Sequence, residues 1–363
     1  MTSNLEIPSP SELSAALKKA GLEAGFSLLG ISPAVAPPGL QRFEDWLDAG
    51  YAGDLRYLTG RRKAYASVQS ILPGARSVVM GAINYCSDDP QPATEGAGRV
   101  ARYAWGQGDY HDWLRKRMRS VADRLHELVK PCKTRVVVDT APLLERDFAR
   151  LSGLGWFGKN TMLINKRQGS WLLLASLLTD VELAPDQPHE TAHCGTCTRC
   201  LEICPTQAFP EPGVLDATKC LAYWNIEQQG DLPHEIATGL GDWLFGCDLC
   251  QEVCPWNRKA PKSSLAECQA SPDLNPIDAR WLLGISPEEF LARYQGTPLE
   301  RPGYDGLRRN AAVVLGNQRH ESARPALESA ACDASPVVAA AARWALERLD
   351  ENRPNAPSEP SDR

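Results

Sequence analysis

The first part of the chain contains two segments with the hydrophobic periodicity of amphipathic helices. Residues 11–26 repeat apolar positions at helical spacing, and residues 109–129 do so with basic side chains between the apolar ones. The apolar positions of the second segment form one stripe: Trp113, Met118, Val121, Leu125 and Leu128. Both segments are predicted to be helices that pack one face into a core.

Short apolar runs alternate with these helices. Runs at residues 77–85, 135–138 and 170–178 have the length and aliphatic content of buried strands. Helices that alternate with buried strands predict an α/β domain. Two prolines, Pro185 and Pro188, mark its end, so the domain is expected to cover residues 1–185.

Beyond residue 276 the pattern becomes helical. Three alanine-rich segments with apolar faces are joined by short polar links: residues 304–317, 323–331 and 336–349. They resemble the stacked helix pairs of HEAT repeats, which present extended surfaces to partners. The alternative is a small bundle that only caps the preceding domain. This helical region is predicted to span residues 271–350, and residues 351–363 to form a disordered tail.

Charge and hydropathy narrow the class of protein. The chain has 363 residues and a formal net charge of −6, so bulk charge gives no nucleic-acid signature. An apolar run at residues 171–178 is the longest obvious one and is far too short to cross a bilayer. The N-terminal sequence shows neither the basic and apolar segments of a signal peptide nor a twin-arginine pair. The sequence therefore predicts a cytoplasmic protein without a membrane partner.

Eight of the twelve cysteines form an arrangement typical of iron–sulfur proteins. One run reads C-x2-C-x2-C-x3-C-P and consists of Cys194, Cys197, Cys200 and Cys204. The second run precedes Pro255 and, with one upstream outlier, consists of Cys220, Cys247, Cys250 and Cys254. Such spacing predicts a ferredoxin-like domain with two [4Fe–4S] clusters, over residues 186–270.

The ligands of each cluster follow from a rule of two-cluster ferredoxins, in which the last cysteine of each run binds the opposite cluster. One cluster is expected on Cys194, Cys197, Cys200 and Cys254. The other is expected on Cys204, Cys220, Cys247 and Cys250. Two zinc sites are the alternative, but zinc ligands usually come as pairs of C-x2-C knuckles. A disulfide framework fits less well, because such scaffolds belong to small secreted domains.

One carboxylate lies where an α/β sheet presents catalytic groups. Asp139 directly follows the predicted strand at residues 135–138. Under an apolar lid the pKa of such a carboxyl would be raised, which suits a proton donor. The alternative is an ordinary turn or helix-capping residue. Two nearby carboxylates, Glu145 and Asp147, are interpreted as surface groups.

A glycine-rich segment follows. Gly153, Gly155 and Gly158 allow the backbone to approach a large ligand closely, or only serve tight turns. Their spacing matches neither the phosphate-binding P-loop nor the dinucleotide fingerprint. A cofactor of another kind is therefore expected in the α/β domain.

Several segments together resemble the epoxyqueuosine reductase family, from about residue 17 to residue 349. Besides both cysteine runs they are LPGARSVVM (72–80), RYAWGQGDYH (102–111), DTAPLLER (139–146), GLGWFGKNTMLIN (153–165) and RNAAVVLGN (309–317). The resemblance implies an N-terminal α/β domain that binds cobalamin, the ferredoxin-like domain beside it, and a C-terminal HEAT-like region that engages tRNA.

The resemblance also implies site residues. Asp139 is the expected proton donor and a cobalamin contact, and the other expected cobalamin contacts are Arg62, Gly158, Lys159, Asn160 and Thr161. Among the basic residues between 301 and 350, and not from the resemblance, Arg308 and Arg309 are the candidates for contact with tRNA phosphates; the alternative is that they are solvated side chains on a helix surface.

The implied reaction reduces the epoxide of epoxyqueuosine at the tRNA wobble position to give queuosine. The clusters pass electrons from an external low-potential donor to cobalamin, and the protein supplies protons and position. A single-stranded anticodon loop makes the base accessible. The chain is expected to act as a monomer. The competing interpretations are a cobalamin-dependent reductive dehalogenase that acts on a small molecule and a plain electron-transfer module.

Overall fold

The computed structural model describes residues 8–351, so most of the predicted disordered tail lies outside the described residues. The chain folds into two compact units, each made of separate stretches of sequence. Unit 1 falls within Met1–Asp88, Gly106–Thr218 and Asp248–Gln269, and unit 2 within Asp89–Trp105, Lys219–Cys247 and Ala270–Arg363. The predicted boundary at residue 270 lies within one residue of this division, whereas no boundary of the two units falls at residue 185.

Unit 1 holds the predicted N-terminal helices and strands together with most of the cysteines. Its helices are α1 (Pro10–Glu23), α2 (Leu40–Asp48), α3 (Arg56–Thr59), α4 (Tyr110–Leu128), α5 (Glu145–Leu151), α6 (Arg199–Glu202) and α8 (Leu249–Glu252). Its strands are β1 (Leu28–Pro33), β2 (Ser77–Asn84), β4 (Thr134–Val137), β5 (Trp156–Phe157), β6 (Leu163–Ile164) and β7 (Leu172–Thr179).

Capping residues set where the two predicted helices begin. Ser9 caps α1 and forms a reciprocal capping box with Glu12, while Pro10 occupies the first turn. Asp109 caps α4 by accepting the backbone N–H of His111 at 2.9 Å. The helices predicted at residues 11–26 and 109–129 are thus confirmed to within a few residues.

The main sheet of unit 1 has the order β1-β2-β7-β4, and every neighbouring pair is antiparallel. The strands predicted at residues 77–85, 135–138 and 170–178 are β2, β4 and β7. The α/β prediction is therefore correct in its alternating elements. The direction of the strands, which the sequence pattern left open, is antiparallel throughout this sheet.

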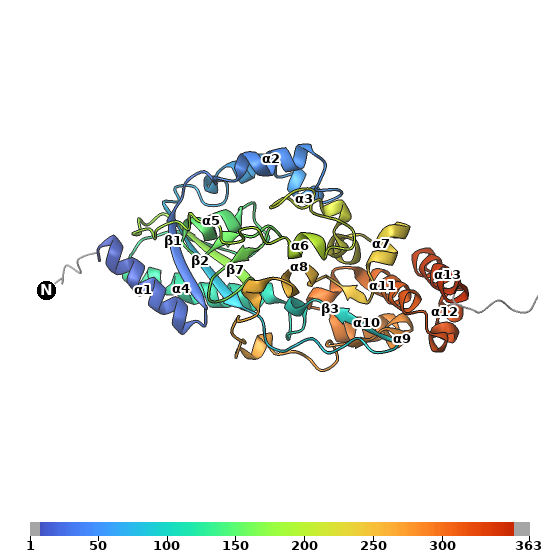
Figure 1. The fold of residues 1–363 in the computed structure, drawn as a ribbon. Coiled ribbons are helices and arrows are strands. Elements are labelled where there is room, and N and C mark those ends of the chain that lie inside the picture. The colour runs from blue at the N-terminus through green and yellow to red at the C-terminus, as the bar shows by residue number, and fades with distance from the viewer. Residues whose placement is uncertain (1–7, 352–363) are drawn as a thin grey trace, which may run out of the picture. The chain divides into compact units, whose positions relative to one another are not determined.

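Helices cover both faces of this sheet, which explains why its strands are apolar along their whole length (Figure 1). On one face Val78 and Met80 of β2 pack in the same cluster as Phe148 of α5. On the other face a Cβ at Gly81 would lie 2.9 Å from Met118 of α4. A strand buried on both faces is apolar throughout, whichever way its neighbours run.

Unit 2 combines a small sheet with the C-terminal helices. Its strands are β3 (Ala97–Val100), β8 (Trp243–Phe245) and β9 (Ile277–Asp278), in which β3 pairs with β8 in parallel and with β9 antiparallel. A short π-helix covers Tyr223–Glu227. The α-helices are α7 (His234–Gly239), α9 (Ala279–Leu283), α10 (Pro287–Tyr294), α11 (Gly303–Gln318), α12 (Arg324–Ala330) and α13 (Pro336–Asp350).

The three alanine-rich helices of the C-terminal region are confirmed as α11, α12 and α13. Helix α13 packs against both of the others. A Cβ at Gly316 of α11 would lie 2.7 Å from the Cα of Ala345, so glycine permits this close approach. That these helices form a HEAT-type repeat stays a prediction.

Among the residues that the structure describes, no helix is both long enough and apolar enough to span a bilayer.

Candidate functional site

Asp139 lies just beyond the C-terminal end of β4, at the edge of the main sheet. Its backbone is left-handed, with φ of 58°, which is uncommon for a residue other than glycine. Its side chain is 57% exposed. The apolar lid expected over this carboxyl is therefore not present in unit 1, and the expectation that burial tunes Asp139 is not supported.

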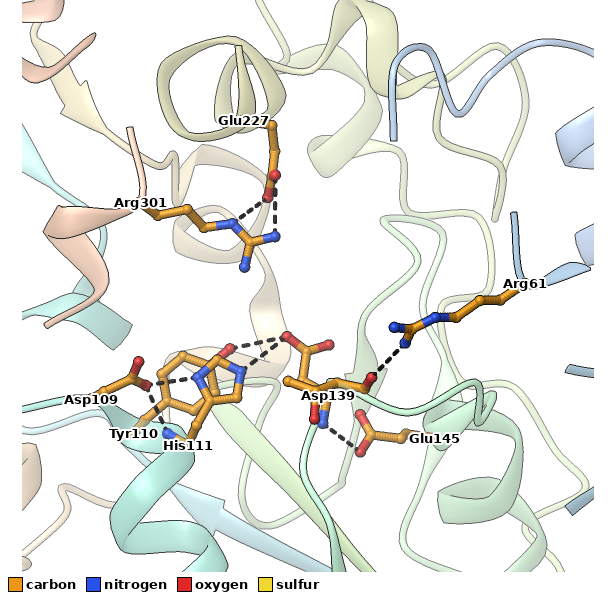
Figure 2. A network of polar contacts seen from close by, with 9 residues as sticks. Arg61, Asp109, Tyr110, His111, Asp139, Glu145, Glu227 and Arg301 are labelled. Atoms are coloured by element: carbon orange, nitrogen blue, oxygen red, sulfur yellow. Dashed lines mark hydrogen bonds and ion pairs between the residues drawn. The ribbon is translucent and has the colours of Figure 1, made fainter. Parts of the chain in front are cut away.

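Two side chains hold the backbone of this loop in place (Figure 2). Glu145 Oε1 accepts the backbone N–H of Asp139 at 3.0 Å. Arg61 Nη1 donates to the backbone carbonyl of Thr140 at 2.9 Å. Because Glu145 is the first residue of α5, the loop and this helix are tied together. Arg61 was not among the predicted site residues; its neighbour Arg62 was.

The carboxylate of Asp139 meets the first residues of α4. Tyr110 donates its hydroxyl to Asp139 Oδ2 at 3.2 Å, and His111 Nε2 lies 3.4 Å from the same oxygen. The other imidazole nitrogen, Nδ1, lies 2.7 Å from Asp109 Oδ1. The imidazole of His111 thus lies between two carboxylates, as Figure 2 shows. Sequence reasoning missed this, although DYH at a helix start was a usable signal.

The two carboxylates control the charge of His111. Burial of the imidazole acts against its protonated form, but hydrogen bonds to Asp109 and Asp139 outweigh burial and raise the pKa of His111 to about 9. At neutral pH this imidazole is therefore a cation that can donate a proton toward Asp139.

A second protonated group lies on the other side of the loop. Burial, and next the negative charge of Asp139, raise the pKa of Glu145 to about 8. The prediction of surface carboxylates is wrong for Asp147, and Glu145 is half-buried. Asp147 is 3% exposed and accepts the backbone N–H of Gly39 at 2.6 Å. Asp147 points inward because α5 packs this face against the sheet, whereas Glu145 points toward the loop of Asp139.

Cys254 joins the first cysteine run within unit 1. Its side chain is buried against Trp156 and Ile164, and Cys194 packs against the same cluster. Burial raises the pKa of the Cys200 thiol to about 11, and the neighbouring thiol of Cys254 adds to the effect. Two other thiols of the first run, Cys194 and Cys197, contribute as well. Cys194 and Cys254 therefore pack against one cluster of residues, and the thiols of Cys194, Cys197 and Cys254 lie near enough to Cys200 to act on its charge.

An unsatisfied donor beside these cysteines fits the binding of a cluster. Trp156 is 2% exposed, and its indole N–H has no hydrogen-bond partner among the described residues. The ring lies edge-on to Trp256, with centroids 5.0 Å apart. A buried orphan donor is costly unless something absent from the chain itself accepts it. Sulfur atoms of a cluster held by Cys194 and Cys254 are suitable acceptors.

The remaining cysteines are divided between the units. In unit 1 helices α6 and α8 pack together, and these helices carry the runs that contain Cys204 and Cys250. In unit 2 lie Cys220 and Cys247. There the side chain of Asn225 bonds both the N–H and the carbonyl of Gly246, at 2.9 Å each, and so connects the two cysteine segments.

Two of the predicted cobalamin contacts, Lys159 and Asn160, bind the cysteine loops. Lys159 Nζ donates to the carbonyls of Gly195 and Cys197 at 2.8 and 3.0 Å. Asn160 is 2% exposed and donates to the carbonyl of Cys250 at 3.2 Å. These side chains thereby position both runs, and their contact with cobalamin stays a prediction.

Other predicted cobalamin contacts have local roles. Arg62 forms a two-pronged ion pair with Asp48. Thr161 has a left-handed backbone, with φ of 65°. A Cβ at Gly158 would lie 2.5 Å from the side chain of Ile164, and one at Gly155 would lie 2.1 Å from the carbonyl oxygen of Ile164. Gly155 and Gly158 therefore permit close packing of the β5–β6 pair. This favours a local backbone role for the glycines over close approach to a large ligand.

The expected tRNA-phosphate contacts require correction. Arg308 is 7% exposed, donates to the carbonyl of Leu283 at 2.9 Å and pairs with Asp333. Arg309 is 1% exposed, and its guanidinium bonds backbone carbonyls of unit 2. Helix α11 is surrounded by other elements of unit 2, so neither guanidinium reaches the surface where a phosphate would bind.

Comparisons with known proteins agree with the site. Residues 66–140 match the family described as epoxyqueuosine reductase QueG, DUF1730, and residues 193–257 match a 4Fe–4S double cluster binding domain. The epoxyqueuosine reductase of Pseudomonas aeruginosa is 38% identical, over 97% of this chain and 98% of its own length. That of Xanthomonas campestris pv. campestris is 39% identical, over 95% and 99%.

Solved structures agree with these relatives. A crystal structure of an epoxyqueuosine reductase with an epoxyqueuosine-modified tRNA-Tyr stem loop has a TM-score of 0.88 and 30% identity, covering 94% of this chain and 91% of that one. A Bacillus subtilis epoxyqueuosine reductase has a TM-score of 0.86 and 29% identity over the same shares. The chain therefore belongs to the epoxyqueuosine reductase family.

Proposed function

We propose that this protein reduces epoxyqueuosine in the anticodon loop of tRNA to queuosine, with Asp139 as the proton donor to the departing epoxide oxygen. The family membership supports the reaction and favours it over a reductive dehalogenase or a plain electron-transfer module. One observation carries the role of Asp139. Its carboxylate lies beside the imidazolium of His111, and Glu145 fixes the loop to which Asp139 belongs.

Loss of the epoxide oxygen as water consumes two electrons and two protons. Bound cobalamin and two [4Fe–4S] clusters supply the electrons and the reactive metal. We assign one cluster to Cys194, Cys197, Cys200 and Cys254, which fit it by their mutual proximity. We assign the other to Cys204, Cys220, Cys247 and Cys250 from the cysteine spacing.

The chain's own residues manage the protons. The imidazolium of His111 passes a proton across the 3.4 Å between Nε2 and Asp139 Oδ2, and Asp139 delivers it to the epoxide oxygen as that oxygen departs. Asp109 holds the opposite imidazole nitrogen and so keeps the ring aimed at Asp139. The hydroxyl of Tyr110 bonds the same Asp139 oxygen and fixes its direction. None of these steps depends on the predicted cobalamin contacts.

The partners of the reaction are a tRNA and an external low-potential electron donor. A relative of this chain was crystallised with a modified tRNA stem loop, which supports tRNA as substrate. We propose that the helical region formed by α11, α12 and α13 engages the tRNA in a HEAT-like manner and that the protein acts as a cytoplasmic monomer.

Replacing Asp139 by Asn tests the proton-donor role. The variant keeps the side-chain size and most hydrogen bonds but has no proton to transfer. Turnover of epoxyqueuosine-tRNA should fall by roughly a hundred- to ten-thousandfold, while cobalamin and iron contents stay at wild-type levels. The matched control is Asp112→Asn, because Asp112 lies on α4 with an 84% exposed side chain. Near-wild-type turnover of fully loaded Asp139→Asn would exclude this role.

A further inference from the structure

Arg309 is a buried cation in unit 2 that has no catalytic or tRNA-binding role in the proposal above. Its side chain extends from α11 to the segment that follows the π-helix. Nη1 donates to the carbonyls of Gln228 and Gly230 at 2.8 and 2.6 Å, and Nη2 donates to the carbonyl of Trp224 at 2.9 Å. The guanidinium thus binds neutral backbone oxygens at three positions of one short segment.

The charge of Arg309 is costly where it lies. Burial lowers the pKa of this guanidinium to about 10, and the carboxylate of Asp231 only partly compensates. A buried charge without a bonded counter-ion is retained only where its hydrogen bonds are well satisfied. The buried guanidinium is therefore retained for the backbone segment that its hydrogen bonds organise.

That backbone leads directly to one cysteine. The carbonyl of Cys220 accepts the N–H groups of Tyr223 and Trp224 at 3.1 and 3.4 Å. Arg309 holds the carbonyl of the same Trp224. Both backbone groups of Trp224 are thus bonded, its N–H to Cys220 and its carbonyl to Arg309, which fixes the turn that presents Cys220.

A second branch of the network leads to the other cysteine of unit 2. Arg309 Nε donates to Asn310 Oδ1 at 3.0 Å. Asn310 is 0% exposed, and its amide donates to the carbonyls of Asn225 and Leu244 at 2.8 and 3.0 Å. Asn225, also 0% exposed, then bonds Gly246, the residue before Cys247.

Gly246 can be held in this way only as a glycine. Its φ is +64°, and a Cβ there would lie 2.5 Å from the Cβ of Ala101. With a left-handed backbone and both of its polar groups bound by one side chain, the entry to Cys247 has little freedom. Buried polar networks of this kind, when fully satisfied, specify a single arrangement.

We propose that Arg309, Asn310 and Asn225 are positioning residues for the second iron–sulfur cluster, because they fix the backbone on which Cys220 and Cys247 are presented. This inference rests on the assignment of those two cysteines as cluster ligands. It does not depend on the substrate of the enzyme. It also gives a role to the Arg-Asn pair that opens the segment 309–317.

The test compares two asparagines of the same helix. Asn310→Ala cuts the path to Asn225, whereas Asn317→Ala removes an amide that bonds the carbonyls of Ala237 and Gly241, away from both cysteine segments. Both variants are purified anaerobically as the full chain, and iron and sulfide are measured with EPR spectra of the reduced protein. Asn310→Ala should lose up to about half of the iron, the content of one of two cubanes, and Asn317→Ala should keep all of it.

Two further variants separate the possible failures. Cys247→Ala should lose about half of the iron; if it keeps all of it, the ligand assignment fails. If Cys247→Ala loses iron but Asn310→Ala has wild-type iron content and EPR spectra, the positioning role alone is overturned. The positioning role is also overturned if Asn317→Ala loses as much iron as Asn310→Ala. If Asn310→Ala does not fold, Arg309→Lys keeps the charge but not the planar fork. It should shift the reduction potential of one cluster and not the other, and unchanged potentials overturn the proposal.

Discussion

Glu145 accepts the backbone N–H of Asp139 at 3.0 Å and so holds a residue whose φ is +58°. A left-handed backbone at a residue other than glycine costs about 1 kcal/mol and persists where surrounding contacts enforce it. The bond places the Asp139 carboxyl beside His111, and the raised pKa of Glu145 means that the acceptor itself is protonated at neutral pH.

Substitutions of Glu145 should separate positioning from proton supply. Glu145→Gln keeps an Oε1 acceptor for the Asp139 N–H and should retain kcat within severalfold. Glu145→Ala releases the loop and should lower kcat by roughly a hundredfold, since small displacements of a reacting group have effects of this size. Steady-state kcat and KM with epoxyqueuosine-tRNA measure both. Equal losses in the two variants would instead indicate that the titrating carboxyl itself is needed.

The charge of His111 should make stability depend on pH. Its pKa is about 9 in the folded protein and about 6.5 when unfolded. The folded state therefore binds this proton more tightly, and the added stability is fully present below pH 6.5 and lost as pH rises through about 9. The thermal midpoint of wild type should exceed that of His111→Gln most at pH 6 and least at pH 9.5. A difference that does not change over this range would contradict the ion-pair interpretation.

The crossed cluster assignment predicts the effect of losing Cys254. Cys254→Ala should abolish the cluster held with Cys194, Cys197 and Cys200, so that about half of the iron is lost while the second cubane stays. Iron analysis and EPR of the reduced protein measure this. The control is Cys332→Ala, an exposed cysteine outside both predicted ligand sets. Full iron in Cys254→Ala would show that the assignment is not crossed.

Close packing of the β5–β6 pair predicts the effect of a methyl group at Gly155. The added Cβ would lie 2.1 Å from the carbonyl oxygen of Ile164, and a backbone atom cannot move aside cheaply. Gly155→Ala should lower the free energy of unfolding by roughly 1–3 kcal/mol, the range of overpacked cores. Gly284→Ala is the control, since its Cβ would approach nothing closer than 3.8 Å. Equal denaturation midpoints for the two variants would contradict the packing argument.

Local signals in the sequence predicted much of this protein. The spacing of the cysteines grouped Cys254 with Cys194, and the structure packs these two side chains against one cluster of residues. Periodicity predicted α1, α4 and the three C-terminal helices, because a helix that buries one face repeats its apolar residues every three or four positions. The strand before Asp139 was likewise visible as a short apolar run.

Other features depend on which segments meet in space, which only the tertiary structure decides. The sheet is antiparallel, but strands covered on both faces look the same in sequence in either direction. Glu145 and Arg309 read as surface charges, because Glu and Arg are usually exposed. Their positions depend on contacts that the fold creates: Glu145 bonds the backbone N–H of Asp139, and Arg309 bonds carbonyls of residues 224–230. A hydrogen bond between distant segments leaves no periodic trace in the sequence, so side-chain positions at the site came from the fold alone.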